Sequence, residues 1–125
     1  MIAASVVKSG MAANPTQRLR QICLALPEAT EKEAWGDPTW RVRDKIFAME
    51  KRGDGRISVW FKAPEGSQEV LVGSDGQRFF VPPYVGHKGW VGMRLDRKPD
   101  WKEVELLIGR SYRMTAPKRL VASSD

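Results

Sequence analysis

A chain of 125 residues, with 42% hydrophobic and 29% charged residues, has room for one compact domain with a core but not for two. Its 21 Lys and Arg against 15 Asp and Glu give a net charge of +6, which favours an anionic partner such as nucleic acid, although a basic protein without such a partner has the same balance. The single cysteine, Cys23, excludes an intramolecular disulfide and predicts a cytoplasmic protein.

The ends of the chain carry no targeting signal that we recognise. The apolar run at the start is too short for a secretion signal and has no basic segment before it. No later run approaches the ~20 apolar residues of a membrane helix, so we expect a soluble protein. We predict a disordered tail over residues 1–13, a single domain over residues 14–119 and a loose C-terminal tail over residues 120–125, with Met11 as an alternative start.

The first predicted element is a helix over residues 15–26. Asn14 is a good N-cap and Pro15 suits the first helical position. Cys23 lies on the apolar side of this helix. No second cysteine or nearby histidine is present to lower the pKa of its thiol, so we predict a buried structural thiol. The apolar side has helical spacing and consists of Leu19, Ile22, Cys23 and Leu26.

An acidic stretch follows Pro27, which ends the predicted helix. Paired carboxylates can serve acid–base catalysis, but here we predict a solvated loop that repels an anionic partner from its side. The only basic residue among the acids is Lys32. The acidic residues are Glu28, Glu31, Glu33 and Asp37.

Three strands are predicted next, over residues 39–43, 45–51 and 56–62. The first and third alternate apolar and polar residues, which is typical of a sheet with one buried face. The sequence Gly53-Asp54-Gly55 predicts a hairpin between the second and third strands.

The alternation also predicts a basic sheet face. If Ile57, Val59 and Phe61 face the core, Trp60 and the residues beside it share the opposite face. Such a face would take phosphates on its cations and stack a base on Trp60; the alternative is that Trp60 covers neighbouring alkyl chains or packs under a helix. The cations of this predicted face are Arg41, Arg43, Arg56 and Lys62.

In the second half of the chain the sequence predicts a helix, a strand, a loop, a second strand and a final helix. The predicted elements are a short helix over residues 67–73, strands over 79–81 and 90–95, and a helix over 101–115. Asp100 and Glu103 predict a capping box for the last helix. Its last turn and the segment after it carry a dense positive patch or, alternatively, a merely solvated helix end; these cations are Arg110, Arg113, Lys118 and Arg119.

Residues 82–89 form a stiff loop in this scheme, because two prolines fix φ and two glycines permit unusual conformations. The loop contains His87, a candidate phosphate or metal contact, and Lys88, a candidate DNA contact. Gly86 to Gly89 match the GxxG of KH domains, but there the loop joins two helices, which rejects the match. With one histidine and one cysteine we find no zinc spacing, Walker loop or triad, and predict no catalytic residue, cofactor or metal.

Several short motifs occur together in a fixed order. They are Leu26-Pro27-Glu28, Trp35-Gly36, Arg41-Val42 before Lys45-Ile46-Phe47-Ala48, Pro82-Pro83-Tyr84, Lys88-Gly89-Trp90-Val91, Trp101 and Ser111-Tyr112. In this order the chain resembles the MmcQ/YjbR family of small bacterial cytoplasmic proteins over residues 15–119. The resemblance implies an α+β fold and DNA binding through a double wing of hairpins, and it brings no catalytic residues.

The expected fold is therefore α+β, with an antiparallel sheet of about five strands, helices packed on one face and the order α-β-β-β-α-β-β-α, similar in shape to frataxin-like and secretion-chaperone folds. The leading functional hypothesis is a non-enzymatic DNA-binding protein, monomeric or weakly dimeric, with salt-sensitive phosphate contacts. A protein-interaction or chaperone-like adaptor is the alternative. A small-molecule site between Pro83-Tyr84, His87 and Trp90 is a third hypothesis.

Overall fold

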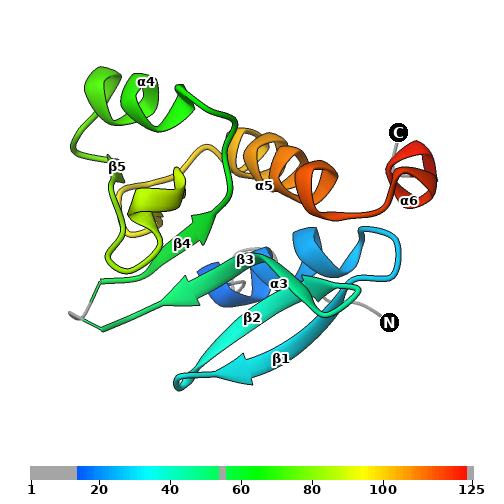
Figure 1. The fold of residues 1–125 in the computed structure, drawn as a ribbon. Coiled ribbons are helices and arrows are strands. Elements are labelled where there is room, and N and C mark those ends of the chain that lie inside the picture. Colours follow the sequence, from blue (N-terminus) through cyan, green and yellow to red (C-terminus); the bar gives the residue numbers. More distant parts are fainter. Residues whose placement is uncertain (1–13, 54–55, 124–125) are drawn as a thin grey trace.

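The computed structural model describes residues 14–53 and 56–123. The tail predicted over residues 1–13, the tip of the predicted hairpin at Asp54 and Gly55, and the last two residues lie outside the described residues. Figure 1 shows a twisted sheet with helices packed against it. None of the helices in the described part is both long enough and apolar enough to cross a membrane.

The helices and strands follow the predicted order along the chain, with three additions, β1, η1 and α6 (Figure 1). The elements are α3 (Pro15–Leu24), β1 (Thr30–Ala34), β2 (Asp37–Val42), β3 (Lys45–Lys51), β4 (Ser58–Phe61), α4 (Ser67–Ser74), β5 (Phe79–Phe80), the 3-10 helix η1 (Gly86–Lys88), β6 (Val91–Arg94), α5 (Trp101–Thr115) and α6 (Lys118–Ser123).

All six strands belong to one antiparallel sheet in the order β1-β2-β3-β4-β6-β5. In β3 and β4 the register pairs Ala48 with Phe61 and Met49 with Trp60. A register shift between Trp40 and Arg41 allows Phe47 to join the core beside Ala48. The α+β fold with an antiparallel sheet is thus confirmed.

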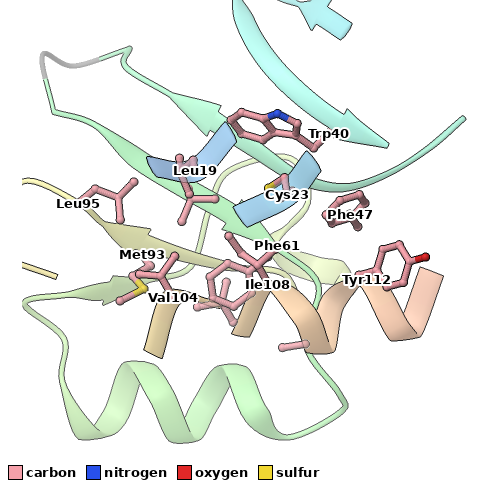
Figure 2. Packing of buried hydrophobic residues seen from close by; sticks show 14 of the residues in the cluster. Leu19, Cys23, Trp40, Phe47, Phe61, Met93, Leu95, Val104, Ile108 and Tyr112 are labelled. Carbon is pink, nitrogen blue, oxygen red and sulfur yellow. The ribbon is translucent and has the colours of Figure 1, made fainter. Parts of the chain in front are cut away.

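The main core lies between the sheet and the helices. Leu19 and Cys23 of α3 and Ile108 of α5 are fully buried against Trp40 and Phe47 of the sheet, as Figure 2 shows. Residues of α4 and α6, among them the buried Leu120, belong to the same cluster. Cys23 is therefore the buried thiol that the sequence predicts, and burial raises its pKa well above the usual value, which makes it a poor nucleophile.

A smaller apolar cluster covers the other face of the sheet, called here the second face. Met49, Trp60 and Trp90 are buried there, and Phe80 and Val85 pack against them. The cover comes from residues 80–90, the segment that the sequence predicts as a strand end and stiff loop. Gly92 of β6 lies directly under the Phe80 ring, where a Cβ atom would collide with it.

Helix ends follow their sequence signals. Asn14 caps α3 in a capping box with Gln17, and α3 ends at Leu24, before the predicted position. Asp100 caps α5 by accepting a hydrogen bond from the backbone nitrogen of Lys102. Glu103 instead accepts a hydrogen bond from Nη1 of Arg78, at 2.7 Å.

One prediction about the sheet needs correction. The acidic stretch is not a loop: Thr30–Ala34 forms the edge strand β1, which makes six strands rather than five. Its side chains are nearly all exposed, so the strand has no apolar alternation to reveal it. The predicted domain end at residue 119 falls inside α6, and Leu120 beyond it is buried in the main core.

Candidate functional site

Two regions at opposite ends of β3 have the properties of a binding site. The first, called the lysine cluster, consists of Lys45, Lys62 and Lys88. The second, called the aromatic pocket, is a hollow of about 760 Å³ on the second face, near the other end of β3. Each region is built by segments that are distant in sequence, so the fold rather than local sequence brings its side chains together.

The lysine cluster is assembled from three segments. Lys45 is the first residue of β3 and pairs with Val42 across a tight turn. Lys62 directly follows β4, and its backbone nitrogen donates a hydrogen bond of 2.9 Å to Oγ of Ser111 in the buried centre of α5. Lys88 is the last residue of η1. These backbone positions are well anchored, while the ammonium groups remain at the surface or half-buried.

Electrostatics distinguish this cluster from scattered surface lysines. Partial burial lowers the pKa of the Lys62 ammonium, and the positive charges of Lys45 and Lys88 lower it further. Within residues 14–53 and 56–123, none of the three ammonium groups forms a salt bridge. Bound negative charge would offset the repulsion that Lys45 and Lys88 exert on Lys62, so an anion is a suitable partner for this cluster.

The aromatic pocket is lined mainly by apolar side chains. Aromatic rings contribute from four places in the chain, and the remaining apolar lining includes Met49, Pro83 and Val85. Lys51 and Ser58 are the lining residues with polar side chains. The four aromatic residues of the lining are Trp35, Trp60, Phe80 and Tyr84.

Trp35 reaches the pocket from the turn between β1 and β2. Ala34 pairs with Asp37, so the turn consists of Trp35 and Gly36, with φ of 55° and 85°. Positive φ at both positions is the type I′ hairpin turn, which favours Asn or Gly at its first position and disfavours a bulky ring. Trp35 occupies that position and is 73% exposed, so neither local propensity nor burial explains it.

Tyr84 resembles Trp35 in its backbone. Its φ is 68°, and the nitrogen of Val85 donates to the carbonyl of Pro83 across it, at 2.7 Å. That is a γ-turn of the strained, positive-φ kind. The Tyr84 side chain is 88% exposed. Two aromatic residues of the pocket lining thus combine a strained backbone with an exposed ring, and such strain concentrates at functional sites.

Among the described residues that line the pocket, Lys51 is the only charged one. Its Nζ lies 5.1 Å from the centre of the Trp35 ring and 5.6 Å from that of Trp60, within the range of cation–π attraction. Trp60 itself is only 8% exposed, and its Nε1 has no hydrogen-bond partner among the described residues. The pocket therefore places one cation among aromatic and apolar walls.

The predicted basic sheet face does not form as one surface. Arg41 donates to Thr39 and lies 3.6 Å from the carboxylate of Asp44, while Arg43 pairs with Glu28 at 2.9 Å. Arg56 is exposed ahead of β4, beyond the opposite end of β3 from Lys45 and Lys62. Of the four predicted cations of this face, only Lys62 belongs to the lysine cluster.

Trp60 lies on the face that the alternation predicts, but it is buried under Phe80 and Val85 rather than open for a base. The predicted patch at the C-terminal end does not join the lysine cluster. Arg113, Lys118 and Arg119 are exposed on α5 and α6. Arg110 is half-buried, and its Nε and Nη2 have no hydrogen-bond partner among the described residues.

Sequence reasoning missed the site role of Lys45, Lys51 and Trp35. A signal for Trp35 was present, since a Trp-Gly pair between two extended segments fits a hairpin turn once the acidic stretch is recognised as a strand. His87 is exposed in η1. Among the residues that the structure covers, no three His, Cys, Asp or Glu side chains gather in a way that could hold a metal ion.

Comparisons with known proteins agree on the fold. The family model YjbR matches residues 24–114. The crystal structure of protein DR2400 from Deinococcus radiodurans, with the family-model domain DUF419, superposes with a TM-score of 0.68. That structure is 20% identical in sequence, and the match covers 77% of this chain and 74% of the other. No curated protein matches the sequence.

Proposed function

The chain belongs to the YjbR family, and on that premise we propose that it is a non-enzymatic domain that binds DNA through salt-sensitive phosphate contacts. The observation that carries this proposal is the lysine cluster, in which the charges of Lys45 and Lys88 act on Lys62 and none of the three forms a salt bridge in the described part of the chain. A DNA phosphate would supply the missing negative charge.

The surroundings of the cluster suit an extended polyanion. The turn between β2 and β3 directly precedes Lys45, and the loop with η1 presents Lys88 from another part of the chain. These two projections serve as the wings of the proposed interface. Lys62, which lies between Lys45 and Lys88 in the sequence, adds the third positive charge. The net charge of +6 adds long-range attraction to the contact itself.

The test compares two variants that remove the same charge from different places. One replaces Lys45, Lys62 and Lys88 with methionine; the control replaces the exposed Lys32, Lys98 and Lys102 with methionine. Fluorescence anisotropy measures binding of a labelled 20-base-pair duplex and of one of its single strands at low salt. We expect the first variant to lose at least about tenfold in affinity and the control to lose much less, because close contacts contribute more than distant charge.

Two results would contradict the proposal. If neither DNA binds the unmodified protein at low salt, the cluster has another partner. If both triple variants lose the same affinity, binding depends on net charge alone, and the cluster is not its site. Cytoplasmic location, a monomeric or weakly dimeric state and the adaptor alternative stay predictions of the sequence.

A further inference from the structure

We propose that the aromatic pocket binds a small planar aromatic carboxylate, with Lys51 as its counter-ion. This goes beyond the proposed function, because the pocket and the lysine cluster lie toward opposite ends of β3 and share no residue. The two sites therefore make separate predictions about ligands and variants.

The walls of the pocket indicate a flat, apolar ligand. Trp35 approaches from the turn between β1 and β2, whereas Phe80 and Tyr84 belong to the segment that precedes η1; Met49 and Pro83 add to the apolar lining. Flat π faces favour stacked or edge-on aromatic partners. The volume of about 760 Å³ lies within the range of pockets that enclose small molecules, roughly 300 to 1,000 Å³.

The charge of the lining indicates one negative group on that ligand. Lys51 is half-buried near the rings of Trp35 and Trp60. Among the described residues, no carboxylate lines the pocket and Lys51 forms no salt bridge. A single ammonium among apolar walls matches a monoanion such as a carboxylate. A nucleotide phosphate suits the three ammonium groups of the lysine cluster better.

The backbone strain at the rim points the same way. Trp35 and Tyr84 hold φ values of 55° and 68°, which their bulky side chains disfavour, and both rings are exposed. Core packing cannot explain the choice of these residues, because their rings are largely in solvent. A ligand between them would bury both rings.

The experiment uses 2-naphthoate as the probe and the uncharged 2-naphthylmethanol as its matched control. Isothermal titration calorimetry measures affinity, and NMR spectra of the five tryptophan indole N–H groups locate the site. We expect naphthoate to bind at least about tenfold more tightly than the alcohol, because a charge-assisted contact is worth more than a neutral one. The indole signals of Trp35 and Trp60 should shift most.

Variants of Lys51 test whether its ammonium group is the counter-ion of the carboxylate. Lys51→Met should remove the preference for naphthoate over the alcohol, and Lys51→Arg should largely restore it; Lys32→Met, on an exposed residue of β1, should change neither affinity. The proposal is overturned if naphthoate and the alcohol bind equally, if Lys51→Met keeps the preference, or if neither probe moves the indole signals. It is also overturned if a short single-stranded DNA displaces naphthoate, because the pocket would then hold a base.

Discussion

Lysine residues at the two ends of β3 lie in contrasting surroundings. Near the start of the strand, Lys45 joins Lys62 and Lys88, and their like charges lower the pKa of Lys62. At the end of the strand, Lys51 lies over the rings of Trp35 and Trp60. In the lysine cluster the ammonium groups repel one another. In the aromatic pocket a single ammonium group lies next to aromatic rings.

The difference shows how one sheet can offer two kinds of site. A group of repelling cations gains most from a polyanion, and that gain is screened by salt. A single cation in an apolar pocket gains from an anion that also fills the pocket, and burial protects the contact from salt. Variants and conditions that affect only one of the two regions therefore test the distinction.

The largest expected effect comes from Ser111, which supports the lysine cluster from beneath. Its buried Oγ donates to the carbonyl of Phe47 at 2.6 Å and accepts from the nitrogen of Lys62 at 2.9 Å. Ser111→Ala leaves both backbone groups unpaired, so we expect the free energy of unfolding to fall by about 2–4 kcal/mol. Urea denaturation measures this change.

Thr115→Ala is the control, because Thr115 only donates to a carbonyl one turn back in α5 and should cost about 1 kcal/mol or less. In the folded Ser111→Ala protein, DNA affinity should fall while naphthoate affinity holds. A parallel loss of both would mean that the two regions are not independent.

A smaller effect of opposite sign is expected at Trp35. Trp35→Asn places a favoured residue at the first position of the type I′ turn, so stability should rise by up to about 1 kcal/mol even though the contact with Lys51 is lost. Naphthoate affinity should fall several-fold. Thermal unfolding and calorimetry provide the two measurements.

The matched control is Arg43→Asn, since Arg43 holds the equivalent position of the turn between β2 and β3, with φ of 52°. This variant should leave naphthoate affinity unchanged. If Trp35→Asn destabilises the protein, the ring contributes to packing, and the argument from backbone strain is wrong.

The smallest predicted effect is a dependence of DNA affinity on alkaline pH. The folded-state pKa of Lys62 is lowered by burial and by Lys45 and Lys88, so the unfolded chain holds more protons between that pKa and the ordinary lysine value near 10.4. The stability contribution of Lys62 therefore rises with pH through this window. DNA binding changes the other way, because a phosphate needs the protonated ammonium.

We expect a loss of DNA affinity of a few-fold, beginning at lower pH than for an ordinary lysine, in anisotropy titrations at constant ionic strength. Lys62→Arg should flatten the profile, because its guanidinium keeps the proton, while Lys102→Arg should leave it unchanged. An identical profile for all three proteins would remove Lys62 from the interface.

Elements with a strong local signal were predictable. The helix expected over residues 101–115 has the bounds of α5, since its cap and apolar period agree. The alternation in β4 correctly assigned Val59 and Trp60 to opposite faces. Strand β1 was missed, because an exposed edge strand of charged residues has no apolar period and resembles a loop.

The candidate sites were less predictable, because distant residues decide which side chains are available. Glu28 neutralises Arg43 from fifteen positions away, and Phe80 and Val85 bury Trp60. Lys62 and Lys88 were predicted as DNA contacts, but Lys62 was assigned to a sheet face with three arginines and Lys88 to a separate loop. Their closeness to Lys45 follows from strand register and from the path of residues 80–90, which local patterns do not determine.

The most direct test of the DNA proposal is the salt dependence of DNA affinity in the two triple-methionine variants. Each lost phosphate contact lowers the slope of log K against log salt by about 0.9 on duplex and about 0.7 on single strands. Removing Lys45, Lys62 and Lys88 should therefore reduce the slope of the unmodified protein by roughly 2 to 3, whereas removing Lys32, Lys98 and Lys102 should leave it nearly unchanged. Equal slopes in the two variants would contradict the assignment of DNA binding to the lysine cluster.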